Sequence, residues 1–268
     1  PILFPDEKQP RSIIVLGDQW IDAHDLASGE TLWTLGGLGS GPVSSPVLAG
    51  DRLFVNAPDQ APEPPPPFSQ LAAEHDSDGD GVLSRSEVEG SWMTRHFGFV
   101  DWDGNGEISK QDWSELHDMM TTDGWGIYAL RTPAPGSEPV TLWRSQQSVT
   151  YIPTGIVYDG VLYMVKDGIV SSYDPQSGEL LERGRLTKGS PKVYASPVAA
   201  DGKIYIGTLE GQMTVLQAGG DWQVLALNDL GDEIWATPAI GDEHLYVRTR
   251  GKLFSFAVQA PARAATSP

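Results

Sequence analysis

A short strand–turn–strand motif recurs along this chain, and it constrains the fold more strongly than any other feature of the sequence. Each copy has a Ser, Thr or Pro segment, a short apolar strand, a Gly or Asp turn, and a strand of β-branched and aromatic residues. The copies begin near Ser45, Pro153, Ser196 and Thr237. Pro197 and Pro238 hold the same place in successive copies and are 41 residues apart. A period of roughly 40 to 50 residues predicts the blades of a β-propeller.

The other half of each unit repeats as well. Residues 23–33 and 172–181 both read as a strand, a tight turn that contains Asp and Gly, and a second strand. A tryptophan follows in the outer strand, and we expect Trp33 and Trp143 to fill the space between adjacent sheets. The sequence therefore predicts blades of four antiparallel strands.

These residues resemble a known repeat family. The pattern A-x-D-x-x-[TS]-G-x-x-x-W in residues 23–33 is similar to the repeat of the pyrroloquinoline-quinone-like β-propellers, and residues 234–250 resemble the C-terminal blade of such proteins. The resemblance covers about residues 12–59 and 124–257 and implies an all-β propeller. About four and a half units are recognisable, the first starting inside a blade, whereas closed rings of the family have seven or eight. We expect a partial ring that lacks N-terminal blades; a self-associating partial propeller is the alternative.

Residues 60–123 interrupt the repeat. They lie between residues 53–55, which read as the second strand of a blade, and residues 125–130, which read as its third strand. The segment opens with a run of prolines and then changes to a helical period. The predicted organisation is a first propeller part at 1–59, a small all-α insert at 60–123, a second propeller part at 124–258 and a disordered tail at 259–268.

The insert is strongly acidic. Between residues 60 and 122 there are thirteen acidic and three basic side chains, a net charge of −10 out of −18 for the whole chain. Such a segment attracts divalent cations and repels nucleic acid and anionic membranes. No nucleic-acid partner is therefore expected, and no stretch of the chain is long and apolar enough to predict a transmembrane helix.

The spacing of the acidic residues predicts the first of two EF-hand loops. Residues 76–87 fit D-x-D-x-D-G-x-[LIV]-[ST]-x-x-E at all twelve positions, the pattern in which hard oxygen ligands converge on one calcium ion. Gly81 permits the sharp turn. The expected ligands are Asp76, Asp78, Asp80, the backbone carbonyl of Val82, Ser84 and Glu87. Leu83 is expected to pair with Ile108 of the second loop across a short two-stranded ladder.

Residues 101–112 form the second predicted loop. Its expected ligands are Asp101, Asp103, Asn105, the backbone carbonyl of Glu107, Ser109 and Asp112. Asp112 stands where EF-hands usually have Glu, and its shorter side chain predicts weaker calcium binding and more tolerance of magnesium. An aspartate at the twelfth position of the loop is also similar to the loops of dockerin modules, which are the alternative to an EF-hand pair. We expect Trp102 and Trp113 to belong to the small core of the insert.

The sequence contains few signals of catalysis. It has no cysteine and no H-E-x-x-H, G-x-S-x-G, phosphate-loop or S-x-x-K motif. Quinoprotein dehydrogenases share the propeller resemblance, but their adjacent cysteine pair is absent and no residue matches their catalytic carboxylate. Pyrroloquinoline quinone is therefore not expected as a cofactor, whereas two calcium ions are.

Three hypotheses follow for the function. The first is a non-catalytic, calcium-binding scaffold that binds another protein at the rim or face of the propeller. The second is a subunit or fragment of a quinone-dependent or other enzyme whose active site lies in missing blades. The third is a calcium switch that opens a groove lined by Met119 and Met120. The family resemblance implies a periplasmic or extracellular location.

Overall fold

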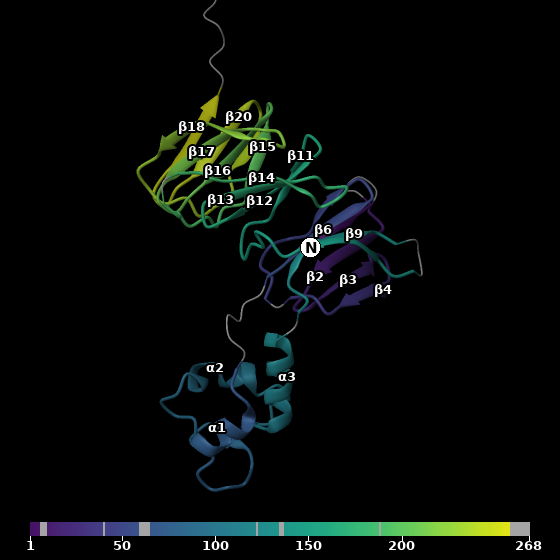
Figure 1. Cartoon of the computed structure of the whole chain (residues 1–268), viewed down its shortest axis with the longest axis vertical. Helices are drawn as coiled ribbons and strands as arrows, with labels where there is room; N and C mark the ends of the chain where they lie inside the picture. The colour runs from purple at the N-terminus through teal and green to yellow at the C-terminus, as the bar shows by residue number, and fades with distance from the viewer. Residues whose placement is uncertain are drawn as a thin grey trace, which may run out of the picture.

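Five β-sheets follow one another along the chain in this computed structural model (Figure 1). The structure describes residues 1–5, 10–39, 41–58, 65–121, 123–133, 137–187 and 189–257, and the predicted tail at 259–268 lies outside them. Four of the sheets contain four antiparallel strands, and the last contains three described strands. The described part of the chain is thus propeller-like and mostly β, as the repeat predicted.

The first two sheets flank the interruption in the repeat. The first consists of β1 (Ile2–Phe4), β2 (Ser12–Leu16), β3 (Trp20–Asp25) and β4 (Thr31–Gly36). The second consists of β5 (Val47–Ala49), β6 (Arg52–Ala57), β9 (Gly126–Arg131) and β10 (Val140–Ser145). The prediction that the first unit starts inside a blade is wrong, because its inner strand β1 is present. No Ser or Thr segment precedes β1 in the sequence, so the motif that marks the other inner strands is missing there.

The remaining sheets follow the same order from the inner to the outer strand. The third contains β11 (Ile156–Tyr158), β12 (Val161–Lys166), β13 (Ile169–Tyr173) and β14 (Leu180–Arg185). The fourth contains β15 (Val198–Ala200), β16 (Lys203–Gly207), β17 (Gln212–Gln217) and β18 (Gln223–Asp229). The fifth contains β19 (Ala239–Gly241), β20 (His244–Arg248) and β21 (Leu253–Ala257).

Hydrophobic side chains between neighbouring sheets form the core. The second strands β6 and β12 each carry an aromatic residue that faces the following blade: Phe54 packs with Leu162 and Met164, and Tyr163 packs with Ile204 and Ile206. Phe54 is 3% exposed and Tyr163 is fully buried. Each such aromatic side chain stabilises the contact by about 1.5–3 kcal/mol. These buried aromatic side chains therefore hold consecutive blades face to face.

The predicted tryptophan positions are confirmed. Trp33 packs into the cluster between the first and second sheets, and Trp143 packs into the cluster between the second and third. The ring of Trp143 lies 5.9 Å from that of Phe54, and its Nε1–H donates to the Pro175 carbonyl at 3.1 Å. The Trp143 indole lies against Gly178, where a Cβ atom would come within 2.6 Å of the ring. These contacts join the outer strand of one blade to a turn of the next.

A row of hydrogen bonds links the blades near their inner strands. The N–H of Ser45 donates to the Thr154 hydroxyl, the N–H of Thr154 to the Ser196 hydroxyl, and the N–H of Ser196 to the Thr237 hydroxyl, each at 3.0 Å. All four residues lie just before an inner strand. The Ser/Thr positions of the repeat thus satisfy backbone donors of the preceding blade, which would otherwise lack a partner.

Three helices and a short ladder lie between β6 and β9, which pair directly from Arg52↔Arg131 to Ala57↔Gly126. The predicted placement of the interruption between second and third strands is therefore confirmed. The elements of this segment are the helices α1 (Phe68–His75), α2 (Met93–Val100) and α3 (Lys110–Thr121) and the strands β7 (Leu83–Ser84) and β8 (Glu107–Ile108). Figure 1 shows them as a separate lobe at the bottom of the view. No described helix is long and apolar enough to span a membrane.

The helical lobe has its own core. The core contains Leu71, Leu83, Val88, Met93, Phe97, Val100, Ile108, Trp113 and Leu116. Trp113 is 2% exposed, and its Nε1–H donates to the Pro66 carbonyl at 2.8 Å, which fixes the end of the proline run. Trp102, in contrast, is 58% exposed, so its predicted place in this core is wrong. The side chain of Met119, which the predicted groove requires, lies outside the described part of the structure.

We expect the row of hydrogen bonds to Ser and Thr hydroxyls to contribute measurably to the free energy of unfolding. Ser196→Ala leaves the Thr154 N–H without its acceptor, and the free energy of unfolding should fall by about 1 kcal/mol. Ser45→Ala is the matched control, because no described donor bonds to the Ser45 hydroxyl, and its effect should stay within about 0.5 kcal/mol. Urea unfolding followed by tryptophan fluorescence measures both. Equal losses for the two variants would contradict this role of the row.

Candidate metal centre

The first acidic loop begins where α1 ends. The Asp76 N–H still donates to the Ala72 carbonyl of the helix at 2.9 Å, while the Asp76 side chain turns into the loop. Its Oδ1 accepts the Gly79 N–H at 2.7 Å and its Oδ2 accepts the Gly81 N–H at 3.1 Å. Gly81 has a φ of 88°, a conformation that glycine adopts without strain. The loop backbone therefore wraps around the Asp76 carboxylate.

Glu87 closes the first loop from the opposite side. Its Oε1 accepts the Ser77 N–H at 2.8 Å, and its Oε2 accepts the N–H and the hydroxyl of Ser84, both at 2.9 Å. These bonds stabilise the ionised form: those from Ser84 and Ser77 lower the Glu87 pKa to about 2. The glutamate is thus charged at neutral pH, with its carboxylate fixed in place.

The second loop repeats this arrangement. The Asp101 N–H donates to the Phe97 carbonyl at the end of α2, and Asp101 Oδ2 accepts the Gly106 N–H at 3.0 Å. Asp103 Oδ1 accepts the Asn105 N–H at 3.0 Å, and Asn105 Oδ1 accepts the Glu107 N–H at 2.8 Å. The side chains of alternate residues thus shape the turn, as in the first loop.

Asp112 takes the place that Glu87 has in the first loop. Its Oδ1 accepts the Trp102 N–H at 3.0 Å, and its Oδ2 accepts the Ser109 N–H at 2.8 Å and the Ser109 hydroxyl. Asp112 is only 3% exposed, and this burial opposes its charge. The hydrogen bonds from Ser109 and Trp102 outweigh the burial, so the Asp112 pKa is still lowered.

The two loops each bring three carboxylates together. One oxygen from each of Asp76, Asp78 and Glu87 lies within 4.8 Å of the other two, and the same holds for Asp101, Asp103 and Asp112. Asp80 is not in the first group; its Oδ1 accepts the Val82 N–H at 2.9 Å. The hydroxyls of Ser84 and Ser109 bond to the closing carboxylates. Metal binding by these carboxylates and hydroxyls stays a prediction. The same holds for Asn105 and for the backbone carbonyls of Val82 and Glu107.

One buried carboxylate oxygen of the second loop has no hydrogen-bond donor among the described residues. Asp101 Oδ1 is buried, and no described residue donates a hydrogen bond to it. A buried oxygen of an ionised carboxylate needs a donor or a cation, because its desolvation is otherwise uncompensated. It belongs to the carboxylate that joins Asp103 and Asp112 in the second loop. The donor set, all oxygens and mostly carboxylates, fits a hard divalent cation.

A shared ladder connects the loops. β7 pairs with β8 through Leu83↔Ile108 and Ser84↔Glu107, which confirms the predicted pairing of Leu83 with Ile108. Both apolar residues are fully buried in the core of the lobe. Because Ser84 precedes the closing Glu87 and Ile108 precedes Ser109, the ladder joins the two loops close to their closing carboxylates.

The exit of the lobe is anchored to the sheets by contacts that the sequence did not reveal. Arg144 of β10 donates to the Trp125 carbonyl from Nε at 3.2 Å and from Nη2 at 2.7 Å, and it forms an ion pair with Asp123 at 3.7 Å. The Tyr128 hydroxyl donates to the Gly124 carbonyl at 2.7 Å. Burial raises the Tyr128 pKa, which keeps this donor protonated.

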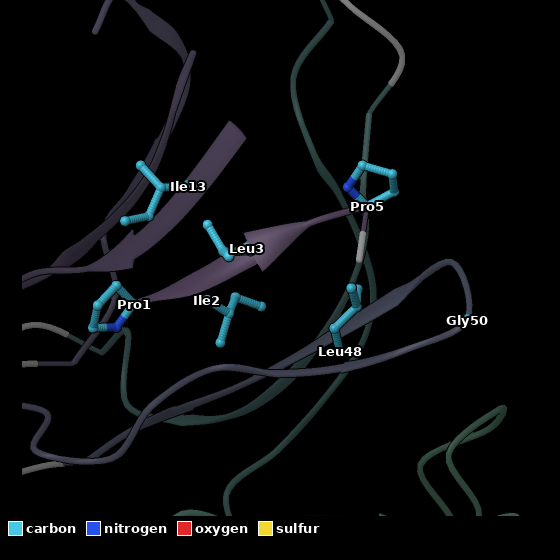
Figure 2. Close-up of a pocket in the computed structure, with 7 residues that line it drawn as sticks. All are labelled: Pro1, Ile2, Leu3, Pro5, Ile13, Leu48 and Gly50. Atoms are coloured by element: carbon cyan, nitrogen blue, oxygen red, sulfur yellow. The ribbon is translucent and has the colours of Figure 1, made fainter. Parts of the chain in front are cut away.

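A pocket elsewhere in the molecule does not resemble a catalytic site. It has a volume of about 680 Å³ and lies at the inner strands of the first two sheets (Figure 2). Ile2, Leu3, Ile13 and Leu48 surround it with apolar side chains. None of its described lining residues carries an acidic, basic or nucleophilic side chain.

The fold and these loops define the class of protein: a propeller-like β-protein with a helical, acidic lobe. No family model matches the sequence, and no curated protein matches it. Among solved structures, BamB from Moraxella catarrhalis is similar, with a TM-score of 0.54 and 11% identity over 93% of this chain and 55% of BamB. The computationally designed Ika8 protein matches with a TM-score of 0.54 and 12% identity over 93% of this chain and 56% of Ika8. The chain spans about half the length of both proteins, and the likeness concerns the fold alone.

The hydrogen bonds to Glu87 predict how the stability of the helical lobe depends on pH. Because its pKa falls from 4.5 unfolded to about 2 folded, its stabilisation is complete above about 4.5 and is lost as the pH falls through about 2. In metal-free protein, Glu87→Gln should therefore lower the melting temperature of the helical lobe at pH 7. The difference from the unsubstituted chain should shrink steadily between pH 4.5 and pH 2. Thermal unfolding followed by circular dichroism measures this, and a constant difference across that range would contradict it.

Proposed function

We propose that this chain binds two calcium ions through a pair of EF-hand loops inserted in a non-catalytic propeller scaffold. The observation that carries the proposal is the convergence of Asp76, Asp78 and Glu87 in one loop and of Asp101, Asp103 and Asp112 in the other. The three carboxylates of each loop repel one another at this distance, and a divalent cation in the loop removes that repulsion. The full EF-hand spacing of both loops makes calcium the cation of choice.

The proposed ligand set extends beyond these carboxylates. In the first loop, Asp80, the Val82 carbonyl and Ser84 join Asp76, Asp78 and Glu87. In the second loop, Asn105, the Glu107 carbonyl and Ser109 join Asp101, Asp103 and Asp112. Calcium takes six to eight oxygen ligands, so both sets are large enough. The hydrogen bonds that now hold Glu87 and Asp112 position these residues to close the coordination shell.

The two sites should differ in strength. Asp112 has one methylene fewer than Glu87, and Ser109 and Trp102 already hold its carboxylate near the loop backbone. Bidentate coordination from this shorter side chain requires a closer approach of the helix α3 to the ion. The second site is therefore the weaker one and the more tolerant of magnesium.

The role of the calcium is structural in this proposal. The ordered lobe presents a fixed surface at the rim of the propeller, where another protein binds. A periplasmic or extracellular location suits this role, because calcium outside the cytoplasm is abundant enough to keep such sites filled. The propeller-like fold supports the scaffold role, because the similar solved structure of BamB shares it.

A second candidate function is a part of an enzyme. The observation that favours it is the coverage: the chain spans 55% of BamB and 56% of Ika8, so an active site could lie in blades outside this sequence. A catalytic constellation in the sequence upstream of this chain would favour the enzyme, and its absence there would favour the scaffold.

Calorimetry tests the calcium proposal directly. Titration of calcium into the metal-free chain should give heat from two sites, and calcium should raise the melting temperature of the helical lobe. Asp76→Asn should weaken the first site at least about tenfold, because it removes a charged ligand from the loop. Glu115→Gln, an exposed acidic position on α3 outside both loops, should leave binding unchanged. Absence of heat and of a melting shift would overturn the proposal.

A second variant tests the order of the two sites. Asp112→Glu restores the longer side chain, so the affinity of the second site for calcium should rise by about tenfold and its preference over magnesium should increase. The reverse change in the first loop, Glu87→Asp, should weaken that site and make the two alike. Competition calorimetry with magnesium measures both effects. Unchanged selectivity in both variants would show that the residue at this position does not set the affinity.

A further inference from the structure

Asn105 is followed by a glycine, unlike the other two asparagines of the chain. Asn56 precedes Ala57, and Asn228 precedes Asp229. The side-chain amide of an asparagine can be attacked by the backbone nitrogen of the next residue. A glycine at that place has no side chain to hinder the attack, and its backbone reaches more conformations than that of any other residue. The sequence therefore makes Asn105, in the second acidic loop, the asparagine most open to this reaction.

Asn105 and Gly106 lie at the surface of the helical lobe, outside its helices and strands. Both are exposed, and the strand β8 begins only at Glu107. Gly106 has a φ of 92°, and a Cβ atom at this residue would meet no described atom within 4 Å. The peptide that joins Asn105 to Gly106 thus has open space beside it, which water can enter.

The other two asparagines are held more firmly. Asn56 is 4% exposed and lies in β6, where its Oδ1 accepts the Thr150 N–H at 2.9 Å. Asn228 is exposed in β18, but this residue and the following Asp229 are both paired with β17. The backbone nitrogen that follows each of them therefore belongs to a paired strand, whereas the nitrogen of Gly106 lies in a loop.

Hydrogen bonds fold the Asn105 side chain back over the residue that would attack it. Its Oδ1 accepts the Glu107 N–H at 2.8 Å, so the side chain spans Gly106. Its Nδ2 donates to Asp103 Oδ2 at 2.9 Å. The Gly106 N–H donates to Asp101 Oδ2 at 3.0 Å, so a carboxylate is already bonded to the proton that this nitrogen must lose. One turn thus holds the attacking nitrogen, the amide carbon and the leaving nitrogen together.

From these observations we propose that Asn105 is a site of spontaneous modification, at which the Gly106 nitrogen attacks the side-chain Cγ of Asn105. The new bond closes a succinimide ring, and the bond between Cγ and Nδ2 breaks. The proton lost by the Gly106 nitrogen ends on the departing nitrogen, which leaves as ammonia. Water then opens the ring. Attack of water on Cγ gives aspartate, and attack on the backbone carbonyl carbon gives isoaspartate, in which the main chain runs through the side chain.

The two products change the second loop in opposite directions. Asp80 has the place in the first loop that Asn105 has in the second. An aspartate at this position gives both loops three aspartates at alternate positions, and the added charge should tighten cation binding. Isoaspartate lengthens the main chain inside the turn and should weaken it. This consequence rests on the proposed function, whereas the modification itself requires no bound metal.

Mass spectrometry of the aged chain tests the site. The full chain is incubated with chelator in water that contains heavy oxygen, at mildly alkaline pH, and is then digested. The peptide that contains Asn105 should gain the mass of a carboxyl group in place of an amide, with heavy oxygen incorporated. This change should be at least about tenfold faster than at Asn56 and Asn228, because only Asn105 precedes a glycine in a loop. Electron-transfer fragmentation distinguishes isoaspartate from aspartate.

Three variants serve as matched controls. Asn105→Gln keeps an amide but places its carbon one bond farther from the backbone, so the reaction at this position should stop. Asn228→Gln should leave the rate at Asn105 unchanged. Asn105→Asp reproduces the aspartate product alone, and calorimetry should show that its second site binds calcium about tenfold more tightly than that of the fresh chain. Circular dichroism verifies that each variant is folded.

Equal rates at the three asparagines, or no conversion at Asn105, would overturn the proposed site. Unchanged calcium affinity in the Asn105→Asp variant would overturn its consequence for the loop. The two proposals fail in different ways. Conversion of Asn105 in a chain that binds no calcium would leave the modification site standing and overturn the proposed function, and calcium binding by a chain whose Asn105 never converts would do the reverse.

Discussion

Face-to-face packing between neighbouring sheets is the contact on which the rest of this structure depends. Phe54 and Tyr163 each pack against the following blade, and the hydrogen bonds from Thr154 to Thr237 link the segments before the inner strands. Connecting segments contribute to this packing as well, since Val193 and Ile234 lie outside the strands and are buried between blades. The helical lobe is different, because it lies in the connection between β6 and β9 and has a separate hydrophobic core.

The helical lobe obeys a different constraint, the repulsion among its carboxylates. Its own hydrophobic core is small, and Leu83 and Ile108 occupy it beside two loops of high negative charge. Hydrogen bonds from backbone N–H groups compensate part of this charge, as the lowered pKa of Glu87 indicates. The buried oxygen of Asp101, which no described donor reaches, marks where the compensation ends. Packing thus brings the carboxylates together, and their mutual repulsion favours a bound cation.

Side-chain patterns allowed much of this to be predicted, and backbone contacts account for most of what was missed. The period of the repeat gave the blades, and the loop spacing gave the pairing of Leu83 with Ile108. The N–H groups of Ser77 and Trp102 donate to the carboxylates of Glu87 and Asp112. Every residue except proline has such a backbone donor, so the residue type does not reveal these bonds. Trp235 has the same residue type as the packing tryptophan Trp143, and only its place before an inner strand leaves it exposed.

The insertion point of the helical lobe makes that lobe modular. Ala57 and Gly126 are register partners in neighbouring antiparallel strands, so the chain leaves and re-enters the sheet at almost the same place. A tight hairpin turn could connect the same two strands, as it does between β12 and β13. The lobe is thus an addition that a propeller blade could have gained in a single event during evolution. Protein engineers could move it to the corresponding hairpin of another blade with little disturbance to the sheets.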